Sequence, residues 1–330
     1  MITRAEPASA DRRAAPLRAR PRFTAPSDEQ PWTQSTWSGS SPRCFQIGVV
    51  GVCVSSQVAA VANDYWRLYH CWQTPPDTGA LHVSVVRGRS RWTGRRRYII
   101  RGGEDELFRV KHREQILPHL EWAINWQVVR HLDRFLQIHA AVVCRDGGCL
   151  VLPGSPQSGK TTLCAGLVAR GWRFLSDEFA LIDPQTLRVY PYPKAMCIKS
   201  GSFAVVRRSG WALDARTRYK KGRKGRVAYL SVSTSPNLIG SACPIRWVAF
   251  PRYAPNRPPR VACMSRGHAA FMLRQLSFNF DRFGDRGLGV ISRAVRGART
   301  VQLESGDLAD TCDLIDRWTS PRTGQQVDPL

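Results

Sequence analysis

The sequence is poor in lysine and in acidic residues, and it contains no long apolar run. Only seven of its 49 basic residues are Lys, which leaves 42 Arg, and the 25 acidic residues give a formal net charge of +24. A membrane-spanning helix needs about 18 consecutive apolar residues, and polar side chains interrupt the nearest stretch, Phe45 to Ala62. The Arg-rich start has no apolar core before a cleavage site, unlike a secretory signal. We therefore expect no membrane span.

The positive charge has two interpretations. A strongly basic surface is typical of proteins that bind nucleic acid, an acidic partner or anionic lipid. The excess of Arg over Lys, together with plentiful Ala, Gly and Pro, is also what compositional drift in a GC-rich coding sequence produces. Two segments concentrate the charge: Arg87 to Arg97, which is either a solvated hairpin tip or a polyanion contact, and the loop Arg216 to Arg226. Both interpretations stay open.

The ten cysteines form no metal or redox motif. The sequence has no C-x-x-C pair and no Cys/His group at zinc-finger spacing. Most cysteines lie among apolar residues, so we predict reduced thiols in the core of a cytoplasmic protein.

The chain divides into three regions by composition. Residues 1–43 are rich in Arg, Pro and Ser without a period, which predicts a disordered tail or a start codon assigned too far upstream. Residues 44–135 predict an N-terminal α+β region, in which apolar patterns indicate strands and one long helix. These are Phe45–Val54, Leu81–Val86, Tyr98–Arg101 and the helix Glu114–Phe135. Residues 136–330 predict an α/β nucleotide-binding domain that ends in helices.

One phosphate-binding loop carries the strongest functional signal. Gly154 to Thr161 fits the Walker A pattern G-x-x-x-x-G-K-[ST], between a predicted strand, Cys149–Pro153, and a predicted helix, Thr161–Arg170. Such a loop aims backbone N–H groups and a helix N-terminus at phosphates. The predicted nucleotide-binding residues are Gly154, Ser155, Pro156, Gln157, Ser158, Gly159, Lys160, Thr161 and Thr162. Gln157 stands where many such loops have a further glycine, and its side chain would crowd the phosphates.

An acidic pair follows this loop at short range. Asp177 and Glu178 come after the predicted strand Trp172–Leu175, seventeen residues beyond Lys160. Ligands of open α/β sheets bind beyond the carboxyl ends of strands, so the pair is expected to face the phosphates. One carboxylate would hold a metal ion while the other accepts a proton. A solvated turn is the alternative for such a pair, and a core position is the alternative for His139 in the preceding apolar strand.

These residues resemble HPr kinase/phosphorylase and its relatives in bacterial gene clusters, which share a nucleotide-binding core with phosphoenolpyruvate carboxykinase. The resemblance rests on the His139 strand, the loop Gly154–Thr161 and the segment Arg170-Gly171-Trp172-Arg173-Phe174-Leu175-Ser176-Asp177-Glu178. It implies an α/β fold with a P-loop in a mixed sheet, and catalytic roles for Asp177, His139 and Lys160. Thr161 and Glu178 would bind Mg²⁺. Glu178 replaces the family's second aspartate, and Arg216–Arg226 is only a positional guess for its substrate-side loop.

We therefore predict an ATP- and Mg²⁺-dependent kinase that transfers the γ-phosphate to a hydroxyl on a protein or peptide. We further expect a homo-oligomer, and an acidic partner for the Arg-rich surface. The first alternative is a catalytically weak ATP-binding scaffold that presents this surface. A decarboxylating carboxykinase would need a Lys/His/Asp metal set that the sequence does not reveal, and no N-K-x-D motif indicates a GTPase.

Overall fold

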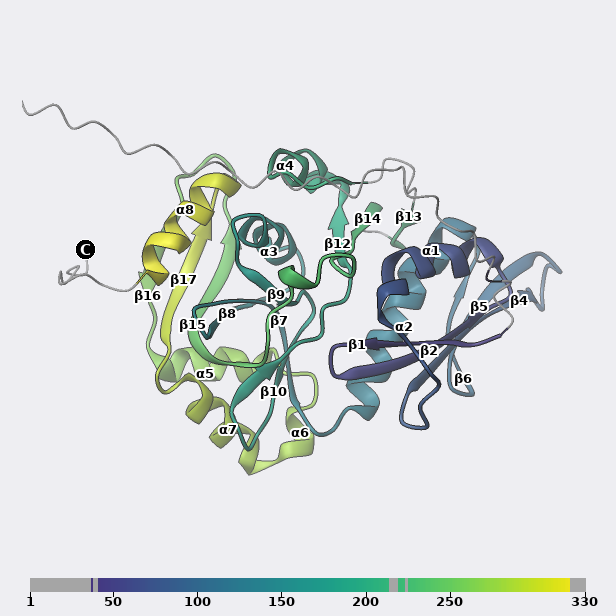
Figure 1. Cartoon of the computed structure of the whole chain (residues 1–330), viewed down its shortest axis with the longest axis horizontal. Coiled ribbons are helices and arrows are strands. Elements are labelled where there is room, and N and C mark those ends of the chain that lie inside the picture. The colour runs from purple at the N-terminus through teal and green to yellow at the C-terminus, as the bar shows by residue number, and fades with distance from the viewer. Residues whose placement is uncertain (1–36, 38–40, 214–218, 223–224, 321–330) are drawn as a thin grey trace, which may run out of the picture.

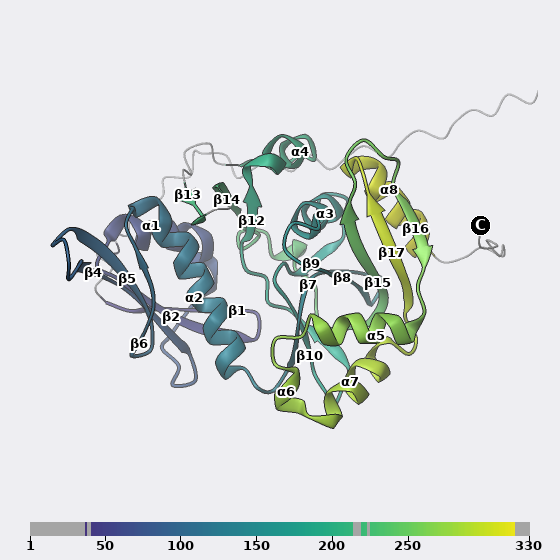
Figure 2. The same ribbon diagram turned by 180° about the vertical axis from the view of Figure 1, so that it is seen from behind.

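The chain folds into two halves that lie side by side in the computed structural model (Figures 1 and 2). The structure describes residues 37, 41–213, 219–222 and 225–320. The first half ends with the helix α2, Ile116–His131, and the second begins with the strand β7, Leu136–Arg145. The predicted tail 1–43 lies almost entirely outside the described residues, as do the last ten residues.

The first half is a mixed sheet of six strands with two α-helices and two short 3-10 helices. The strand order is β3-β1-β2-β4-β5-β6. The strands are β1 Arg43–Ile47, β2 Val50–Ser56, β3 Gln73–Thr74, β4 Leu81–Arg89, β5 Arg96–Gly102 and β6 Asp105–Val110; the other helices are α1 Ala59–Tyr69, η1 His70–Trp72 and η2 Arg113–Gln115. The predicted single strand Phe45–Val54 is wrong: the chain reverses at Gly48, whose φ of 62° favours glycine. Of the predicted hairpin segment Arg87–Arg97, residues 90–95 form the connection between β4 and β5.

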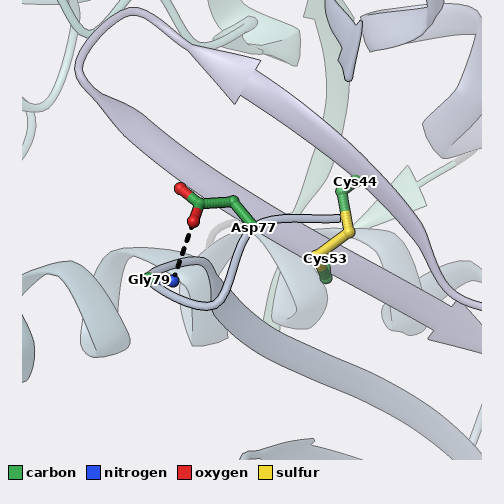
Figure 3. Close-up of a disulfide and its surroundings, with 4 residues drawn as sticks. All are labelled: Cys44, Cys53, Asp77 and Gly79. Atoms are coloured by element: carbon green, nitrogen blue, oxygen red, sulfur yellow. Dashed lines mark hydrogen bonds between the residues drawn. A yellow bond between two sulfur atoms is a disulfide. The ribbon is translucent and has the colours of Figure 1, made fainter. Parts of the chain in front are cut away.

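That reversal also corrects the prediction of reduced cysteines. Cys44 on β1 and Cys53 on β2 are directly opposite each other, with Cα atoms 4.0 Å apart, and form a disulfide (Figure 3). The pairing was hidden because a single strand would have kept both residues far apart. Disulfides are rare in the cytoplasm, so this pair removes part of the support for a cytoplasmic location, which stays a prediction. The other cysteines in the described part of the chain are free.

The second half is a mixed sheet between two layers of helices. Its strand order is β11-β10-β7-β8-β15-β17-β16, with β9 also paired to β7. The further strands are β8 Gly148–Pro153, β9 Arg173–Ser176, β10 Phe179–Ile182, β11 Arg188–Tyr190, β15 Cys243–Tyr253, β16 Arg260–Cys263 and β17 Arg299–Ser305; the helices are α3 Lys160–Val168, α5 Arg266–Gln275, α6 Phe280–Phe283, α7 Asp285–Val295 and α8 Leu308–Thr319. This confirms an α/β architecture.

The two faces of this sheet separate along β7. Ala141 and Val143 pack into the cluster under α3 and α8, whereas Ala140 and Val142 pack into the cluster under α5 and α7. This alternation is the period of a strand buried on both faces. Figure 1 shows α3 and α8 on one side of the sheet and α5, α6 and α7 on the other.

Four strand ends meet at one edge of the sheet. Strand β8 is parallel to β15, and β15 is parallel to β17, whereas β7 runs antiparallel to β8 and to β9. The residues after Pro153, Ser176, Tyr253 and Ser305 therefore all emerge at the same edge, which is where ligands bind in open α/β sheets.

A small sheet joins the two halves. It has the order β12-β14-β13, with β12 Met196–Lys199, β13 Tyr219–Lys220 and β14 Arg226–Leu230, and it is accompanied by η3 Ser200–Ser202, α4 Phe203–Arg208 and η5 Pro236–Leu238. Just before β12, Lys194 donates to the carboxylate of Glu121 on α2 at 2.9 Å; both side chains are 4% exposed. Lys194 also donates to Asn125 Oδ1 and the Glu121 carbonyl, and the Tyr69 hydroxyl donates to Glu121. A buried ion pair therefore holds the first half against the second.

No helix in the described part of the chain is both long and apolar enough to cross a membrane.

Candidate functional site

The phosphate loop lies between β8 and α3, as its sequence predicts. Gly159 ends the loop with a φ of 93°, a conformation in which glycine is favoured, and Lys160 begins the helix. Only 6% of Lys160 is exposed, and its ammonium donates to the carbonyl oxygens of Gly154 at 2.6 Å and Ser155 at 2.8 Å. The lysine charge is thus held inside the loop, where phosphate oxygens are expected to bind.

Gln157 is the strained residue of this loop. Its φ is 78°, in the left-handed region that costs a residue with a side chain about 1–2 kcal/mol. The loop is also tightly packed at its start, since a Cβ on Gly154 would lie 2.8 Å from Ser158 Oγ. The glycine-like backbone at Gln157 explains why glycine is common at this position and what its replacement costs.

The acidic pair lies at a break in a strand. Val142 of β7 is opposite Ser176, and His139 of β7 is opposite Phe179, so β9 and β10 follow one another along β7. At the break, the Ser176 hydroxyl accepts hydrogen bonds from the backbone N–H groups of Glu178 and Phe179 at 3.3 and 3.1 Å. This hydroxyl fixes the two carboxylates where the strand pairing is interrupted. Asp177 is 5% exposed and Glu178 is half-buried.

Burial dominates the electrostatics of Asp177. Removal from water, with a further contribution from the neighbouring Glu178 charge, raises the pKa of Asp177 to about 7. The Thr161 hydroxyl, which donates to this carboxylate, and the charges of Lys160 and Lys221 oppose the rise in pKa. A carboxylate with a pKa near neutrality can both accept and release a proton under physiological conditions.

The same carboxylate fits a divalent cation. Asp177 Oδ1 is buried and has no hydrogen-bond partner among the described residues, although Thr161 hydrogen-bonds to the same carboxylate. Mg²⁺ needs only one or two carboxylates when phosphates and water supply its other ligands. In the described ranges no group of three or more His, Cys, Asp or Glu side chains could hold a metal on its own. A metal held by Thr161 and Glu178 beside this carboxylate would therefore need a bound phosphate.

His139 lies close to both elements. Its carbonyl accepts the backbone N–H of Gly154 at 3.3 Å, and its ring is 5.4 Å from the ring of Phe278. The next residue, Ala140, donates its N–H to the Glu178 carbonyl at 3.3 Å. The strand thus links the loop to the acidic pair, and the half-buried His139 side chain faces the same cavity as both.

A cavity of about 980 Å³ brings the predicted residues together. Nine of the residues predicted for nucleotide binding, catalysis or metal binding line this cavity: His139, Pro156, Gln157, Gly159, Lys160, Thr161, Thr162, Asp177 and Glu178. Gly154, Ser155 and Ser158 belong to the loop but do not line the cavity. This volume lies at the upper end of the usual range for small-molecule sites.

Two groups of lining residues were not predicted. One comes from the ends of β15 and β17: Tyr253, Asn256, Arg257, Pro258, Ser305, Gly306, Asp307, Leu308, Asp310 and Thr311. The other comes from the small sheet and α4: Cys197, Lys199, Ser200, Gly201, Ser202, Val205 and Arg208. From the guessed loop Arg216–Arg226, Lys221 reaches the cavity; residues 214–218 and 223–224 lie outside the described residues.

No protein-family model matches the chain, and no curated protein matches it either. The site is therefore interpreted from its own chemistry.

Proposed function

We propose that the protein is an ATP- and Mg²⁺-dependent phosphotransferase of the HPr kinase type, acting on a hydroxyl of a protein or peptide. The cavity carries the proposal, because it brings Lys160 and Thr161 of the phosphate loop together with the buried carboxylate of Asp177, whose pKa is raised to about 7. An ordinary Gly/Ser turn at the start of a helix would not require a buried carboxylate with a raised pKa beside it. The position of the loop between a strand and a helix of a mixed sheet supports the proposal.

The order of the strands supports one orientation of the proposed nucleotide. Asp177 and Glu178 lie beyond β7 on one side of β8, whereas Tyr253 and Ser305 lie at the ends of β15 and β17 on its other side. With the triphosphate over the loop, the γ-phosphate points to Asp177 and the nucleoside to Tyr253. The acceptor then approaches from the small sheet, beside Asp177.

Each residue has a physical role in this arrangement. Lys160 and the backbone N–H groups of the loop bind the phosphates, and His139 lies beside the acidic pair. Bound Mg²⁺ would neutralise charge on the β- and γ-phosphates, held by Thr161 and Glu178. Asp177 accepts the proton of the acceptor hydroxyl, and its raised pKa makes it a stronger base than an ordinary aspartate.

The test is transfer of radiolabelled γ-phosphate to protein in the presence of Mg²⁺. We expect Lys160→Ala and Asp177→Asn each to reduce transfer by at least about 100-fold, as the loss of a general base usually does. Asp310→Asn, at an exposed carboxylate on the cavity rim, is the matched control and should keep transfer. Equal transfer by wild type and Asp177→Asn would contradict the proposal.

Gln157 favours one alternative, an ATP-binding scaffold with little turnover. Its left-handed backbone and its side chain in the loop both work against close contact with phosphates. Saturable ATP binding, combined with equally negligible turnover in wild type and Asp177→Asn for every acceptor tried, would support the scaffold.

A further inference from the structure

The acceptor end of the cavity is built by the small sheet and α4. The backbone of Tyr192, which leads into this sheet, donates to the Leu175 carbonyl of β9 at 2.8 Å. The Thr162 hydroxyl on α3 donates to Ser202 Oγ of η3 at 2.8 Å. These bonds fix the small sheet between the helix of the phosphate loop and the acidic pair, and Figure 1 shows β12 and α4 beside α3.

The charges at the two ends of the cavity differ. At the acceptor end the lining residues include three cations, Lys199, Arg208 and Lys221, and no carboxylate. The nucleoside end carries Arg257 together with two carboxylates, Asp307 and Asp310. The catalytic pair lies between the two ends. A hydroxyl that reaches Asp177 from the small sheet therefore passes a surface of positive charge.

Of these three cations, Lys221 is the one whose charge acts on Asp177. It is half-buried, and its ammonium lies 3.9 Å from Cys197 Sγ. Burial lowers the pKa of Lys221, but Cys197, Glu178, Glu121 and Asp177 together raise it above the usual value. Lys221 is therefore charged at neutral pH despite the desolvation. A partly desolvated lysine in a cavity is a common anchor for an anion.

We propose that the acceptor is an acidic peptide, whose carboxylate near the reacting hydroxyl binds Lys221 with help from Lys199 and Arg208. This inference rests on the proposed kinase function. In the transfer the hydroxyl oxygen bonds to the γ-phosphorus, and the bond from that phosphorus to the β–γ bridging oxygen breaks. The bridging oxygen keeps the electron pair and leaves with ADP, and the hydroxyl proton passes to Asp177. The peptide carboxylate is unchanged and serves only to bind.

The first experiment compares synthetic serine peptides that differ in charge alone. One has Asp and Glu beside the serine, one has Asn and Gln, and one has Lys. Two further peptides have neutral side chains and end in the serine, one with a free and one with an amidated C-terminus. We expect the acidic peptide, or the peptide with a free terminal carboxylate, to show a kcat/KM at least about tenfold above the neutral ones. The two carboxylate peptides show which source the site accepts. Equal kcat/KM across the set would overturn the inference while leaving a working kinase.

Variants test Lys221 directly. Lys221→Met should raise the KM for the carboxylate peptide about tenfold and leave the neutral peptide nearly unchanged. Lys220→Met is the matched control, because Lys220 is the exposed neighbour, lies 3.7 Å from Glu114 and does not line the cavity. A fall in kcat that is equal for all peptides would assign Lys221 to the transferring phosphate and overturn the inference.

A binding measurement separates this inference from the kinase proposal. Fluorescent peptides are titrated into Asp177→Asn protein with a non-hydrolysable ATP analogue, so that no turnover is required. Tighter binding of the acidic peptide, lost in Lys221→Met and weakened by salt, supports the acceptor class even if transfer is absent. Equal affinity for acidic and neutral peptides would exclude an acidic acceptor, whether or not the protein turns over ATP.

Discussion

One buried carboxylate lies at the interface between the two halves and another lies in the cavity, and their surroundings differ. At the interface the Glu121 charge is compensated at 2.9 Å by Lys194, and Tyr69 donates to the same carboxylate. In the cavity Asp177 has a second carboxylate beside it in the chain and a raised pKa. Each of the two carboxylates has one oxygen without a hydrogen-bond partner among the described residues, so the difference lies in the neighbouring charge. One carboxylate is neutralised within the protein, and the other is left ready for a ligand.

Under the proposed function, the difference marks the place where the molecule gives up stability for chemistry. Burying a charge is tolerated when a partner of opposite sign lies against it, and is costly otherwise. Asp177, the strained Gln157 and the exposed Tyr253 are each unfavourable for the protein alone, and all three line one cavity. Concentration of unfavourable features at one place is typical of a functional site. The predictions below test this contrast in turn.

Removal of the charge at the interface should have the largest effect on stability. Lys194→Met leaves Glu121 buried without its cation, so we expect a loss of about 3–5 kcal/mol in the free energy of unfolding. Chemical denaturation measures it. The double variant Lys194→Met/Glu121→Gln should regain a large part of the loss, because no uncompensated charge remains. If both proteins are equally destabilised, the interface depends on packing and not on charge.

Removal of the Asp177 charge from the cavity should raise the free energy of unfolding, whereas removal of the interface charge lowers it. Asp177 has its pKa raised to about 7, so between about pH 4 and 7 the folded protein binds a proton that the unfolded chain does not. Its contribution to stability therefore falls as pH rises through this window and is lowest above pH 7. Asp177→Asn lacks this cost and should be more stable than wild type at pH 8, by on the order of 3–4 kcal/mol, with the difference vanishing near pH 4.

The measurement is denaturation from pH 4 to 8 with a chelator and without nucleotide. The exposed Asp310 offers the control, since Asp310→Asn should follow wild type at every pH. A pH-independent difference between Asp177→Asn and wild type would show that the carboxylate is not desolvated as the structure indicates.

Local sequence patterns were enough to predict the loop and the acidic pair of the cavity. The loop, the strand before it and the acidic pair are close in the chain, so periodicity and spacing were enough to group Lys160, Thr161 and Asp177, which line one cavity. The strand before the loop was predicted as Cys149–Pro153 and is Gly148–Pro153 in the structure. Short-range patterns of this kind predict elements well when apolar runs are flanked by clear turn residues.

The remaining cavity residues and the interface ion pair depend on strand and side-chain pairings that no local sequence pattern specifies. Tyr253 reaches the cavity because β15 pairs with β8, about 95 residues earlier in the chain, and Ser305 because β17 pairs with β15. The ion pair of Glu121 with Lys194 likewise joins residues 73 positions apart. At the other extreme, β1 and β2 were merged because Gly48 alone marked their turn. Strand order is a tertiary property, so these residues were not predicted.

The exposed Tyr253 tests the nucleoside end of the cavity. Tyr253 is 57% exposed, whereas the interface tyrosine Tyr69 is fully buried and hydrogen-bonded. An aromatic ring left open beside the phosphate loop can stack on a base, which is commonly worth about 1–3 kcal/mol. Tyr253→Ala should weaken ATP binding roughly tenfold and leave tripolyphosphate binding unchanged, as calorimetry can show. Phe271→Ala, at an aromatic side chain that is 53% exposed outside the cavity, should change neither. Equal weakening of both ligands would place Tyr253 against the phosphates instead.

Gln157 tests the smallest cost in the cavity. Gln157→Gly relieves a left-handed backbone worth about 1–2 kcal/mol, but glycine also makes the unfolded chain more flexible, which offsets about 0.4–1 kcal/mol. The net gain in unfolding free energy should therefore be no more than about 1 kcal/mol. Gln157→Ala keeps the backbone strain and removes the crowding side chain, so it separates the two effects. Tighter ATP binding in both variants would identify the side chain as the obstacle, and tighter binding in Gln157→Gly alone would identify the backbone. If neither variant binds ATP better than wild type, the loop accepts phosphates with glutamine in place, and Gln157 no longer favours the scaffold.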